Sequence, residues 1–187
     1  MEVVETALPE VKLIKPKIFG DDRGFFYESF RKQVYQNHGI TLEFVQDNLS
    51  KSNKGVLRGL HLQNPNSQGK LVTVLSGEVY DVAVDVRVGS PNFGKSVGFY
   101  LSEHNKHQLW VPPGFAHGFQ VTSESATFFY KCTDYYNPRS EMSILWNDPK
   151  IAIDWPLPDP SLSEKDRTAL SLDSVEESRL CRYTENT

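Results

Sequence analysis

A nine-residue stretch over 55–63 carries the side chains best placed for chemistry, an arginine and a histidine three residues apart. Alternate side chains of an extended strand share a face, so His61 and Gln63 are expected on one face and Arg58 on the other. The long Arg58 side chain still reaches the same cavity, especially where Gly59 lets the strand bend. A histidine on the inner face of a β-structure is a structural group, a metal ligand or a base, and apolar neighbours favour the base.

Four cations lie near glycines, turns or the expected start of a helix: Arg23, Arg58, Lys70 and Lys165. Each of them alone is typical of a solvated surface. Together they suit a diphosphate, because guanidinium groups bind phosphate oxygens in bidentate fashion and an ammonium adds a point charge. Lys70 follows a glycine without the glycine spacing of a P-loop, so that motif is excluded.

Three further candidates also have purely structural interpretations. Asp166 follows Ser163 by three residues, the spacing of a helix capping box, which accounts for an acid at that position. Tyr130 stands in an aromatic run that is typical of a core strand. His117 follows a Pro-Gly turn, where a structural hydrogen bond and a ligand contact are equally good interpretations. The sequence leaves these alternatives open.

The elements that must position these groups are mainly short strands. Strands are expected at 3–19, 44–48, 55–63, 71–75, 82–88, 97–101, 109–111, 118–121, 126–131 and 143–146. The clearest is 82–88, where valines alternate with other residues. One short helix is expected over 30–37, with Ser29 as its cap and Gly39 at its end, and another begins at Ser163. Many short strands and little helix predict an antiparallel sandwich or barrel.

Composition limits the class of protein. The 187 residues suit one domain, which we take as 1–187, with a strand arm over about 1–20 and a polar helical tail over about 163–187, frayed from about 174. The net charge of −4 disfavours nucleic acid as a partner. Two scattered cysteines are not a disulfide framework, and neither a signal peptide nor a membrane-spanning run is visible. A soluble, cytoplasmic protein without membrane binding is therefore expected.

Two stretches, 55–63 and 110–118, resemble the two motifs of the cupin superfamily, a small double-stranded β-helix related to the jelly roll. In metal-binding cupins the first motif supplies two histidines and a glutamate, and the second supplies another histidine. Here Gln63 and Gln68 replace the second histidine and the glutamate, and two imidazoles without a carboxylate make a poor divalent-metal site. We therefore expect a mainly β, cupin-type jelly-roll barrel with short flanking helices and no metal.

A more specific resemblance extends from about residue 5 to residue 172. Seven segments look, in order, like those of the dTDP-4-dehydrorhamnose 3,5-epimerase family: 20–28, 44–48, 56–63, 68–72, 113–119, 135–138 and 162–166. The resemblance implies a homodimer of cupin fold, without cofactor, that acts on a dTDP-4-keto-6-deoxyhexose. The implied reaction inverts carbons 3 and 5 of dTDP-4-dehydro-6-deoxy-D-glucose and gives dTDP-4-dehydro-L-rhamnose, a step of dTDP-L-rhamnose biosynthesis.

The same resemblance implies the roles of individual residues. His61 is the base that removes the proton next to the ketone, Asp166 orients it, and Tyr130 returns a proton to the other face of the ring. Lys70 is assigned to the oxyanion that develops on the ketone oxygen. The implied binding residues are Arg23, Phe26, Glu28, Gln46, Asn48, Arg58, His117, Tyr136, Glu141 and Lys165. One departure is that residues 167–170 lack the proline often found there in the family, which affects the end of the helix and leaves the His–Asp pair intact.

Three alternatives remain at this stage. An epimerase of another dTDP-deoxysugar pathway that inverts one carbon would use the same catalytic trio, so the motifs do not separate it. A cupin metal oxygenase is disfavoured by Gln63 and Gln68. A non-catalytic sugar-nucleotide-binding cupin is disfavoured because binding alone does not require a base, an orienting acid and a proton donor together.

Overall fold

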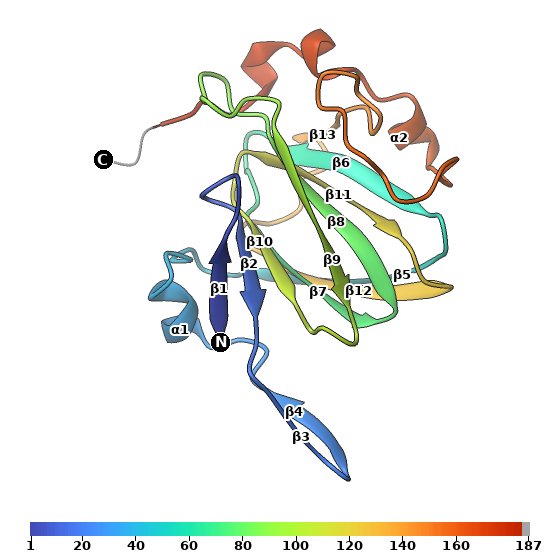
Figure 1. Cartoon of the computed structure of the whole chain (residues 1–187). Coiled ribbons are helices and arrows are strands. Elements are labelled where there is room, and N and C mark those ends of the chain that lie inside the picture. Colours follow the sequence, from blue (N-terminus) through green and yellow to red (C-terminus); the bar gives the residue numbers. More distant parts are fainter. Residues whose placement is uncertain (185–187) are drawn as a thin grey trace.

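The computed structural model describes residues 1–184 and consists mainly of strands (Figure 1). The strands are β1 (Glu2–Glu5), β2 (Lys12–Lys15), β3 (Ile18–Asp21), β4 (Gly24–Tyr27), β5 (Gln46–Asn53), β6 (Leu57–Gln63), β7 (Lys70–Ser76), β8 (Glu78–Asp85), β9 (Ser96–Ser102), β10 (Gln108–Val111), β11 (Phe115–Val121), β12 (Ser125–Cys132) and β13 (Glu141–Ser143). The helical segments are α1 (Lys32–Gln36), α2 (Glu164–Arg167) and the 3₁₀ turns η1 (Leu172–Ser174) and η2 (Glu177–Arg179). Within residues 1–184, no helix has the length and apolar character needed to cross a membrane.

Two antiparallel sheets face each other. One has the order β1-β2-β10-β7-β12-β5, the other has the order β13-β6-β11-β8-β9, and β3 pairs with β4 in a separate hairpin. Neighbouring strands of both sheets are often distant in sequence, as is usual for jelly rolls. The architecture confirms the expected mainly β, cupin-type fold with short helices.

The main core fills the space between the two sheets, because alternate residues of each strand point inward. Val72 and Val74 of β7 face Val79 and Ala83 of β8 across this core, and Phe128 of β12 packs with them. Burying one such branched or aromatic side chain contributes about 1.5–3 kcal/mol. The same alternation determines which side chains of β6, β7, β11 and β12 point into the space between the sheets.

The five-stranded sheet is apolar on its outer face as well. Val82 and Val84 of β8 pack there against Ile144, Leu172 and Leu180 from the C-terminal part of the chain. This explains why the valine alternation is so regular: the residues between the valines face the main core, and the valines face the C-terminal segment. The C-terminal segment thus forms a third layer, drawn in orange and red in Figure 1.

The expectation that the chain frays from about residue 174 is wrong for the described part of the tail. Leu180 is buried, and the backbone of Val88 exchanges hydrogen bonds with Cys181 and Tyr183. A polar composition with one well-placed leucine is enough to dock the segment on an apolar face. Residues 185–187, the last of the predicted tail, lie outside the described residues.

Two predicted boundaries also need correction. The first helix covers Lys32–Gln36 instead of 30–37, and Ser29 does not cap it, because the helix begins later and its N-cap position falls at Arg31, without a side-chain cap hydrogen bond. The strand expected over 82–88 begins at Glu78 and ends at Asp85, whose carboxylate accepts the backbone N–H of Arg87 in a turn.

The central strand β6 contains a bulge that decides where its polar side chains point. Two residues separate Arg58 from His61, whereas the paired segment of β11 has only Gly118 between the corresponding positions. The extra residue reverses the alternation and brings Arg58 and His61 to one face, as the expected bend at Gly59 allows. Gly59 has a φ of +129°, and a Cβ there would lie 2.5 Å from the Cα of Gly118.

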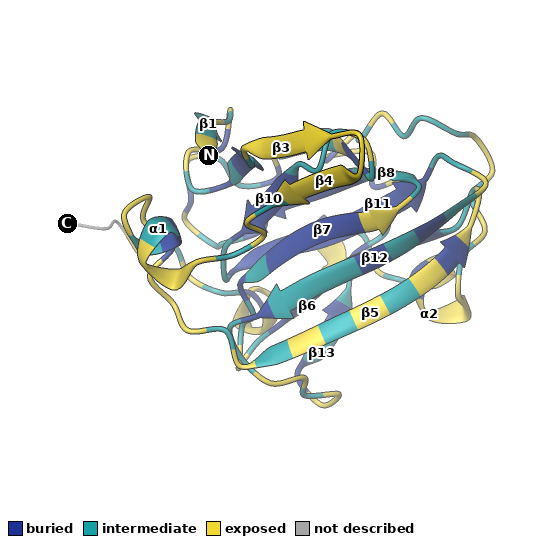
Figure 2. Ribbon diagram, turned by 90° about the horizontal axis from the view of Figure 1, so that it is seen from below, coloured by how far each residue is buried: buried dark blue, intermediate teal, exposed yellow. Residues whose placement is uncertain are grey.

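The β3–β4 hairpin projects from the sandwich and is exposed along both strands (Figure 2). It displays Phe19, Phe25 and Phe26, the last of them 70% exposed. The outer face of the six-stranded sheet also exposes large apolar side chains, among them Leu49 and Leu75. Exposed apolar side chains that gather on one surface are typical of sites that contact another molecule.

Candidate active site

An open cavity of about 620 Å³ lies between β6, β13 and α2. Its polar lining consists of Arg58, His61, Tyr136, Glu141, Ser161, Ser163, Lys165 and Asp166. A smaller cavity of about 260 Å³ adjoins it at Tyr136, which lines both, and is completed by Gln46, Asn48, Gln68 and Tyr130. The fold thus brings together most of the residues that the sequence singled out.

Another cavity, of about 650 Å³, lies beside the C-terminal segment and differs in character. Its most buried cation, Arg87, is paired with Asp85 at 2.6 Å and with Glu10 at 2.9 Å. The guanidinium also lies over the rings of Phe115 and Tyr183. Arg87 is therefore committed to internal contacts. None of the described residues that line this cavity is a histidine, and its carboxylate, Glu10, is already paired with Arg87.

A histidine–carboxylate pair forms the floor of the first cavity. His61 Nε2 lies 2.5 Å from Asp166 Oδ1. Asp166 is held by Ser163, whose Oγ donates to Asp166 Oδ2 at 2.8 Å and accepts the Asp166 backbone N–H at 3.2 Å. The helix cap predicted from sequence is thus present, and the same cap directs the carboxylate at the imidazole. The cap is therefore confirmed, and the orienting role of Asp166 stays a prediction that the contact with His61 supports.

The electrostatics of this pair suit a neutral base beside an ionised acid. Burial lowers the pKa of His61, Asp166 opposes the shift, and the ammonium groups of Lys165 and Lys70 add to it, so the pKa lies below its ordinary value. Burial works to raise the pKa of Asp166, but the hydrogen bonds from His61 and Ser163 outweigh burial and leave that pKa lowered. With Nε2 facing the carboxylate, Nδ1 of the imidazole is free to accept a proton.

Lys70 and Tyr130 reach the site from the facing sheet. Lys70 begins β7, and the register of β7 and β12 places Lys70 opposite Cys132 and Val72 opposite Tyr130. Burial lowers the pKa of Lys70 and raises the pKa of Tyr130. Tyr130 therefore keeps its phenolic proton at neutral pH, and it lies on the opposite sheet from His61.

Two cations line the mouth of the cavity. Arg58 donates from Nε to Ser52 Oγ at 3.1 Å, and Lys165 Nζ lies 2.7 Å from Glu141 Oε1. Tyr136 donates its hydroxyl to the other oxygen of Glu141 at 3.0 Å. The remaining guanidinium nitrogens of Arg58 and the ammonium of Lys165 are suited to an anionic ligand in this cavity.

The two glutamines that replace metal ligands of other cupins hold a loop. Gln63 donates to the carbonyls of Asn66 and Tyr135 and accepts the N–H of Asn137, and Gln68 donates to the carbonyl of Asp134. These bonds position the loop that carries Tyr136 between the two cavities. Among the described residues, no group of three or more His, Cys, Asp and Glu side chains is arranged to hold a metal ion.

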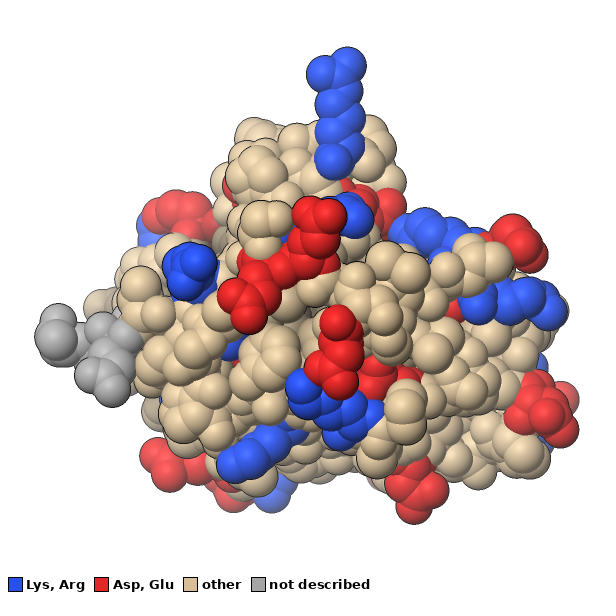
Figure 3. All heavy atoms as spheres, turned by 90° about the horizontal axis from the view of Figure 1, so that it is seen from above, with Lys and Arg blue, Asp and Glu red and all other residues tan. Residues whose placement is uncertain are grey.

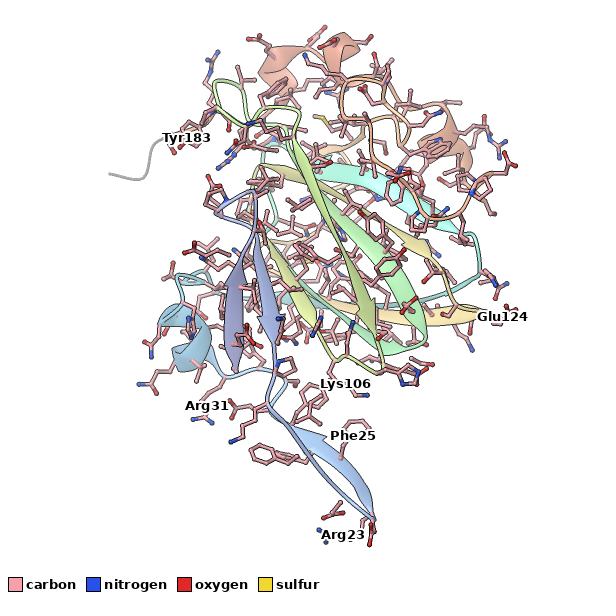
Figure 4. The ribbon with its side chains drawn as sticks, viewed as in Figure 1. Arg23, Phe25, Arg31, Lys106, Glu124 and Tyr183 are labelled. Atoms are coloured by element: carbon pink, nitrogen blue, oxygen red, sulfur yellow. The ribbon has the colours of Figure 1, made fainter. Side chains whose placement is uncertain are left out.

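Three predicted binding residues are not brought to the cavity within one chain. Arg23, Phe26 and Glu28 belong to the β3–β4 hairpin or its end, and Arg23 lies at the far tip, directed away from the sheets (Figure 4). Arg23 pairs with Asp21 and Glu28 pairs with Arg31, both at 2.5 Å on the surface. The remaining predicted residues gather in or beside the two cavities.

His117 lines neither cavity within one chain, and its binding role stays a prediction. It is buried, 7% exposed, and its Nε2 lies 3.0 Å from both oxygens of Asp81. It pairs with His61 across β6 and β11, so it lies in the barrel interior beneath the cavity. Asp81 was not singled out from the sequence, although a lone acid between inward-facing Val79 and Ala83 was a usable signal.

Neither sign of charge predominates on the face of the molecule seen in Figure 3. Lys and Arg side chains are interspersed with Asp and Glu side chains over the face seen in Figure 3. This pattern agrees with the small net charge of −4. An anionic ligand must therefore be held by the local cations of the cavity instead of by long-range attraction.

Comparisons with known proteins give a consistent result. A family model described as dTDP-4-dehydrorhamnose 3,5-epimerase matches residues 5–174. Proteins of that name from Salmonella typhimurium and Neisseria gonorrhoeae are 57% and 55% identical over 94% and 96% of this chain. The chain spans 97% of the Salmonella protein but only 55% of the Neisseria protein.

A solved structure gives the same relationship in three dimensions. The dTDP-6-deoxy-D-glucose-3,5-epimerase of Legionella pneumophila, in complex with dTDP-4-keto-L-rhamnose, superposes with a TM-score of 0.96. It is 57% identical, and the match covers 98% of both chains. The similarity therefore includes the strands, the cavity and the C-terminal segment together.

Proposed function

Because the chain belongs to the dTDP-4-dehydrorhamnose 3,5-epimerase family, we propose that it is an isomerase with this activity in dTDP-rhamnose biosynthesis. The substrate is dTDP-4-dehydro-6-deoxy-D-glucose, the carbons inverted are 3 and 5, and the product is dTDP-4-dehydro-L-rhamnose. The observation that carries the proposal is the His61–Asp166 contact of 2.5 Å in a cavity that also holds cations and that adjoins a smaller cavity lined by the partly buried phenol of Tyr130.

His61 removes the proton in the first half of each inversion. The hydrogen next to the ketone leaves as a proton to Nδ1, and its bonding electrons move to the carbonyl oxygen as an enolate. Asp166 fixes the tautomer with Nε2 protonated and stabilises the imidazolium that forms. The lowered pKa of His61 keeps the free imidazole neutral and ready to accept the proton.

Lys70 and Tyr130 complete the reaction from the other side. The Lys70 ammonium stabilises the enolate oxygen, where the negative charge develops. Tyr130 then donates its phenolic proton to the carbon from which His61 took one. Because β6 and β12 belong to facing sheets, the base and the acid approach the sugar ring from opposite faces, which is what inversion requires.

The nucleotide part is held at the mouth of the cavity. Arg58 and Lys165 bind the diphosphate through charge-assisted hydrogen bonds. Gln46, Asn48, Tyr136 and Glu141 surround the sugar and the nucleoside. A dTDP-linked sugar is anionic and does not cross a bilayer unaided, so the enzyme shares the cytoplasm with its substrate in this proposal.

A homodimer accounts for the residues that one chain leaves outside the site. We assign Arg23, Phe26 and Glu28 to the cavity of a second copy, which the projecting β3–β4 hairpin reaches. The exposed outer face of the six-stranded sheet, with Leu49 at 64% exposure, supplies the contact between copies. In this arrangement the exposed phenylalanines of the hairpin are covered.

Light scattering tests the dimer. We expect Leu49→Asp to give a monomer with weakened substrate binding, and Leu42→Asp, at an exposed leucine outside the sheets, to leave the dimer intact. A wild-type chain that is monomeric and fully active would contradict the assignment of the hairpin to a second copy.

The reaction is tested with dTDP-4-keto-6-deoxyglucose in deuterated water, with carbons 3 and 5 followed by NMR. Deuterium at both carbons, and a product that a rhamnose-forming reductase accepts, is the expected result. Label at one carbon alone would indicate a single-carbon epimerase of another deoxysugar pathway. No label at either carbon, with dTDP still bound, would indicate a binding protein.

A further inference from the structure

Gln63 is a buried glutamine, only 4% exposed, at the end of β6. Its side-chain amide makes three hydrogen bonds, all of them to backbone groups. Nε2 donates to the carbonyl of Asn66 at 2.8 Å and to the carbonyl of Tyr135 at 3.2 Å. Oε1 accepts the N–H of Asn137 at 2.9 Å. Both donor hydrogens and the oxygen of the amide are therefore engaged, as burial of such a group requires.

Two of these three contacts fall on the peptide groups that flank Tyr136. The carbonyl of Tyr135 belongs to the peptide before Tyr136, and the N–H of Asn137 belongs to the peptide after it. The N–H of Tyr136 itself donates to Oε1 of Gln46 at 2.9 Å. Gln46 begins β5 and Gln63 ends β6, and these strands belong to facing sheets. The backbone of one loop residue is therefore held from both sheets.

The side chain of Tyr136 is fixed at its far end as well. Its hydroxyl donates to Oε2 of Glu141 at 3.0 Å, and Glu141 is the cross-strand neighbour of Gln63 between β13 and β6. The backbone and the hydroxyl of Tyr136 are thus attached to adjacent positions of one sheet. Tyr136 is nevertheless 52% exposed, and it lines both cavities. The exposed aromatic side chain is therefore held in place at both ends.

Such an attachment increases the affinity of a site for its ligand. A loop that becomes ordered only when the ligand binds loses conformational entropy at that moment, and this loss weakens binding. A side chain that is already fixed avoids most of the loss. In the proposed function, Tyr136 is one of the residues that surround the sugar and the nucleoside. The contacts of Gln63 therefore act on a group that meets the substrate.

We propose that Gln63 is a positioning residue that holds Tyr136 ready for the sugar nucleotide, and that it contributes to substrate affinity without contacting the substrate. Gln63 lines neither cavity, so its effect reaches the ligand through Tyr136. His61 lies on the same strand but is held by Asp166. The chemical step is therefore independent of the contacts of Gln63. The inference rests on the proposed function, in which Tyr136 meets the sugar nucleotide.

The test compares KM and kcat for dTDP-4-keto-6-deoxyglucose in Gln63→Met and in the wild type, with folding checked by circular dichroism. Methionine is unbranched and of similar length, but it cannot donate to the two carbonyls. We expect KM to rise about 2- to 12-fold, the effect of losing one aromatic contact. We expect kcat to stay within about twofold, because only binding is affected. Gln63→Glu keeps an acceptor for the N–H of Asn137 and is expected to raise KM less.

A double-mutant cycle shows whether Gln63 acts through Tyr136. We expect Tyr136→Ala to raise KM, and Gln63→Met to change KM by less than about twofold once the ring of Tyr136 is absent. Such non-additivity is the signature of two residues that act through one contact.

Gln120→Met is the matched control, because Gln120 makes the same kind of contact away from the site. Gln120 is fully buried, donates to the carbonyl of Leu157 at 2.9 Å and accepts the N–H of Leu157 at 3.0 Å. Neither residue lines the two cavities. We expect Gln120→Met to lower the urea midpoint of unfolding and to leave KM within about twofold of the wild type.

Amide hydrogen exchange of the wild type without substrate tests the positioning itself and requires no variant. The N–H groups of Tyr136 and Asn137 are both hydrogen-bonded to glutamine side chains, so we expect them to exchange slowly. Exchange of both at the rate of an open loop would show that Tyr136 is not held in advance, and it would overturn the inference.

The outcomes distinguish this inference from the proposed function. A folded Gln63→Met protein with an unchanged KM overturns the inference, and so do additive effects in the cycle with Tyr136→Ala. An equal rise of KM in Gln120→Met also overturns it, since the effect would then be a general loss of structure. A wild type that binds the sugar nucleotide but exchanges no proton at carbon 3 or 5 overturns the proposed function instead. In that case the same cycle is measured as Kd by calorimetry, and additivity still overturns the inference.

Discussion

Replacement of Asp166 by asparagine removes the charge beside His61 while changing almost nothing in shape. The carboxylate receives one hydrogen bond from His61 at 2.5 Å and another from Ser163 at 2.8 Å. A hydrogen bond to a charged group contributes about 1.5–3 kcal/mol. Loss of the bond to His61 in the transition state therefore predicts a fall in kcat of about 10- to 150-fold. The fall is larger if the amide NH₂ turns toward Nε2 and selects the wrong tautomer.

The same substitution has a directional effect on pH dependence. Asp166 opposes the lowering of the His61 pKa, so its removal lowers that pKa further. His61 must be neutral to accept a proton, and the acid limb of kcat/KM is set by its protonation. The limb is therefore expected to move to lower pH by about 1 unit. The variant is therefore expected to have a lower rate at its optimal pH, while the pH range in which it is active extends further toward acid.

The assay is exchange of the substrate proton at carbon 5 in deuterated water, followed by NMR between pH 5 and 9. Glu164→Gln is the matched control, because it makes the same change on the same helix at a side chain that is 82% exposed. We expect this control to behave like wild type. An Asp166→Asn protein that exchanges within about threefold of wild type, with an unmoved acid limb, would refute the orienting role of the carboxylate.

Three further predictions follow from the same geometry. His61→Ala abolishes turnover and leaves dTDP affinity, measured by calorimetry, largely intact, since the diphosphate is assigned to other residues. Tyr130→Phe spares proton exchange at carbon 5 more than completed inversion, because abstraction by His61 precedes donation by the phenol. Gly59→Ala lowers both stability and activity, since its Cβ would meet the backbone of Gly118 at 2.5 Å; Gly55→Ala, also at positive φ but in open space, costs about 1–2 kcal/mol.

Each of these has an outcome that contradicts it. For His61, weakened binding with unchanged chemistry would move the residue from the base to the binding site. For Tyr130, equal loss of exchange and inversion would count against the phenol as the acid. For Gly59, a urea midpoint no lower than that of the Gly55 variant would show that the bulge tolerates a side chain.

Local sequence patterns determined the fold class and the types of group in the site. Alternation is a property of neighbouring residues, so the strands around Val72, Val84 and Phe128 could be predicted with errors only at their ends. Capping chemistry is equally local, and Ser163 begins α2 as predicted. By contrast, Ser29 matched the pattern of a cap but lies two residues before the actual N-cap position, Arg31.

The resemblance to a family supplied roles that no local pattern contains. It named Tyr130 and Lys70. Without the resemblance, Tyr130 is interpreted as a core residue of a strand and Lys70 as a residue that follows a turn. It also named Arg23, which one chain leaves far from the cavity (Figure 4). For that residue, the proposed homodimer reconciles the sequence relationship with the single-chain geometry.

Only the tertiary structure decided which groups meet. His61 and Asp166 are 105 residues apart, and their contact depends on the C-terminal segment packing over the outer face of the five-stranded sheet. The bulge in β6 exists because β11 has one residue fewer between the same pairs, which is a property of two strands together. Asp81 has the same origin: its neighbours in sequence are apolar, and its partner His117 comes from β11, which lies beside β8 only in the folded sheet. Sequence specifies side chains and their periodicity, whereas the distances that make a base, an acid and a counter-charge are set by the packing of elements far apart in the chain.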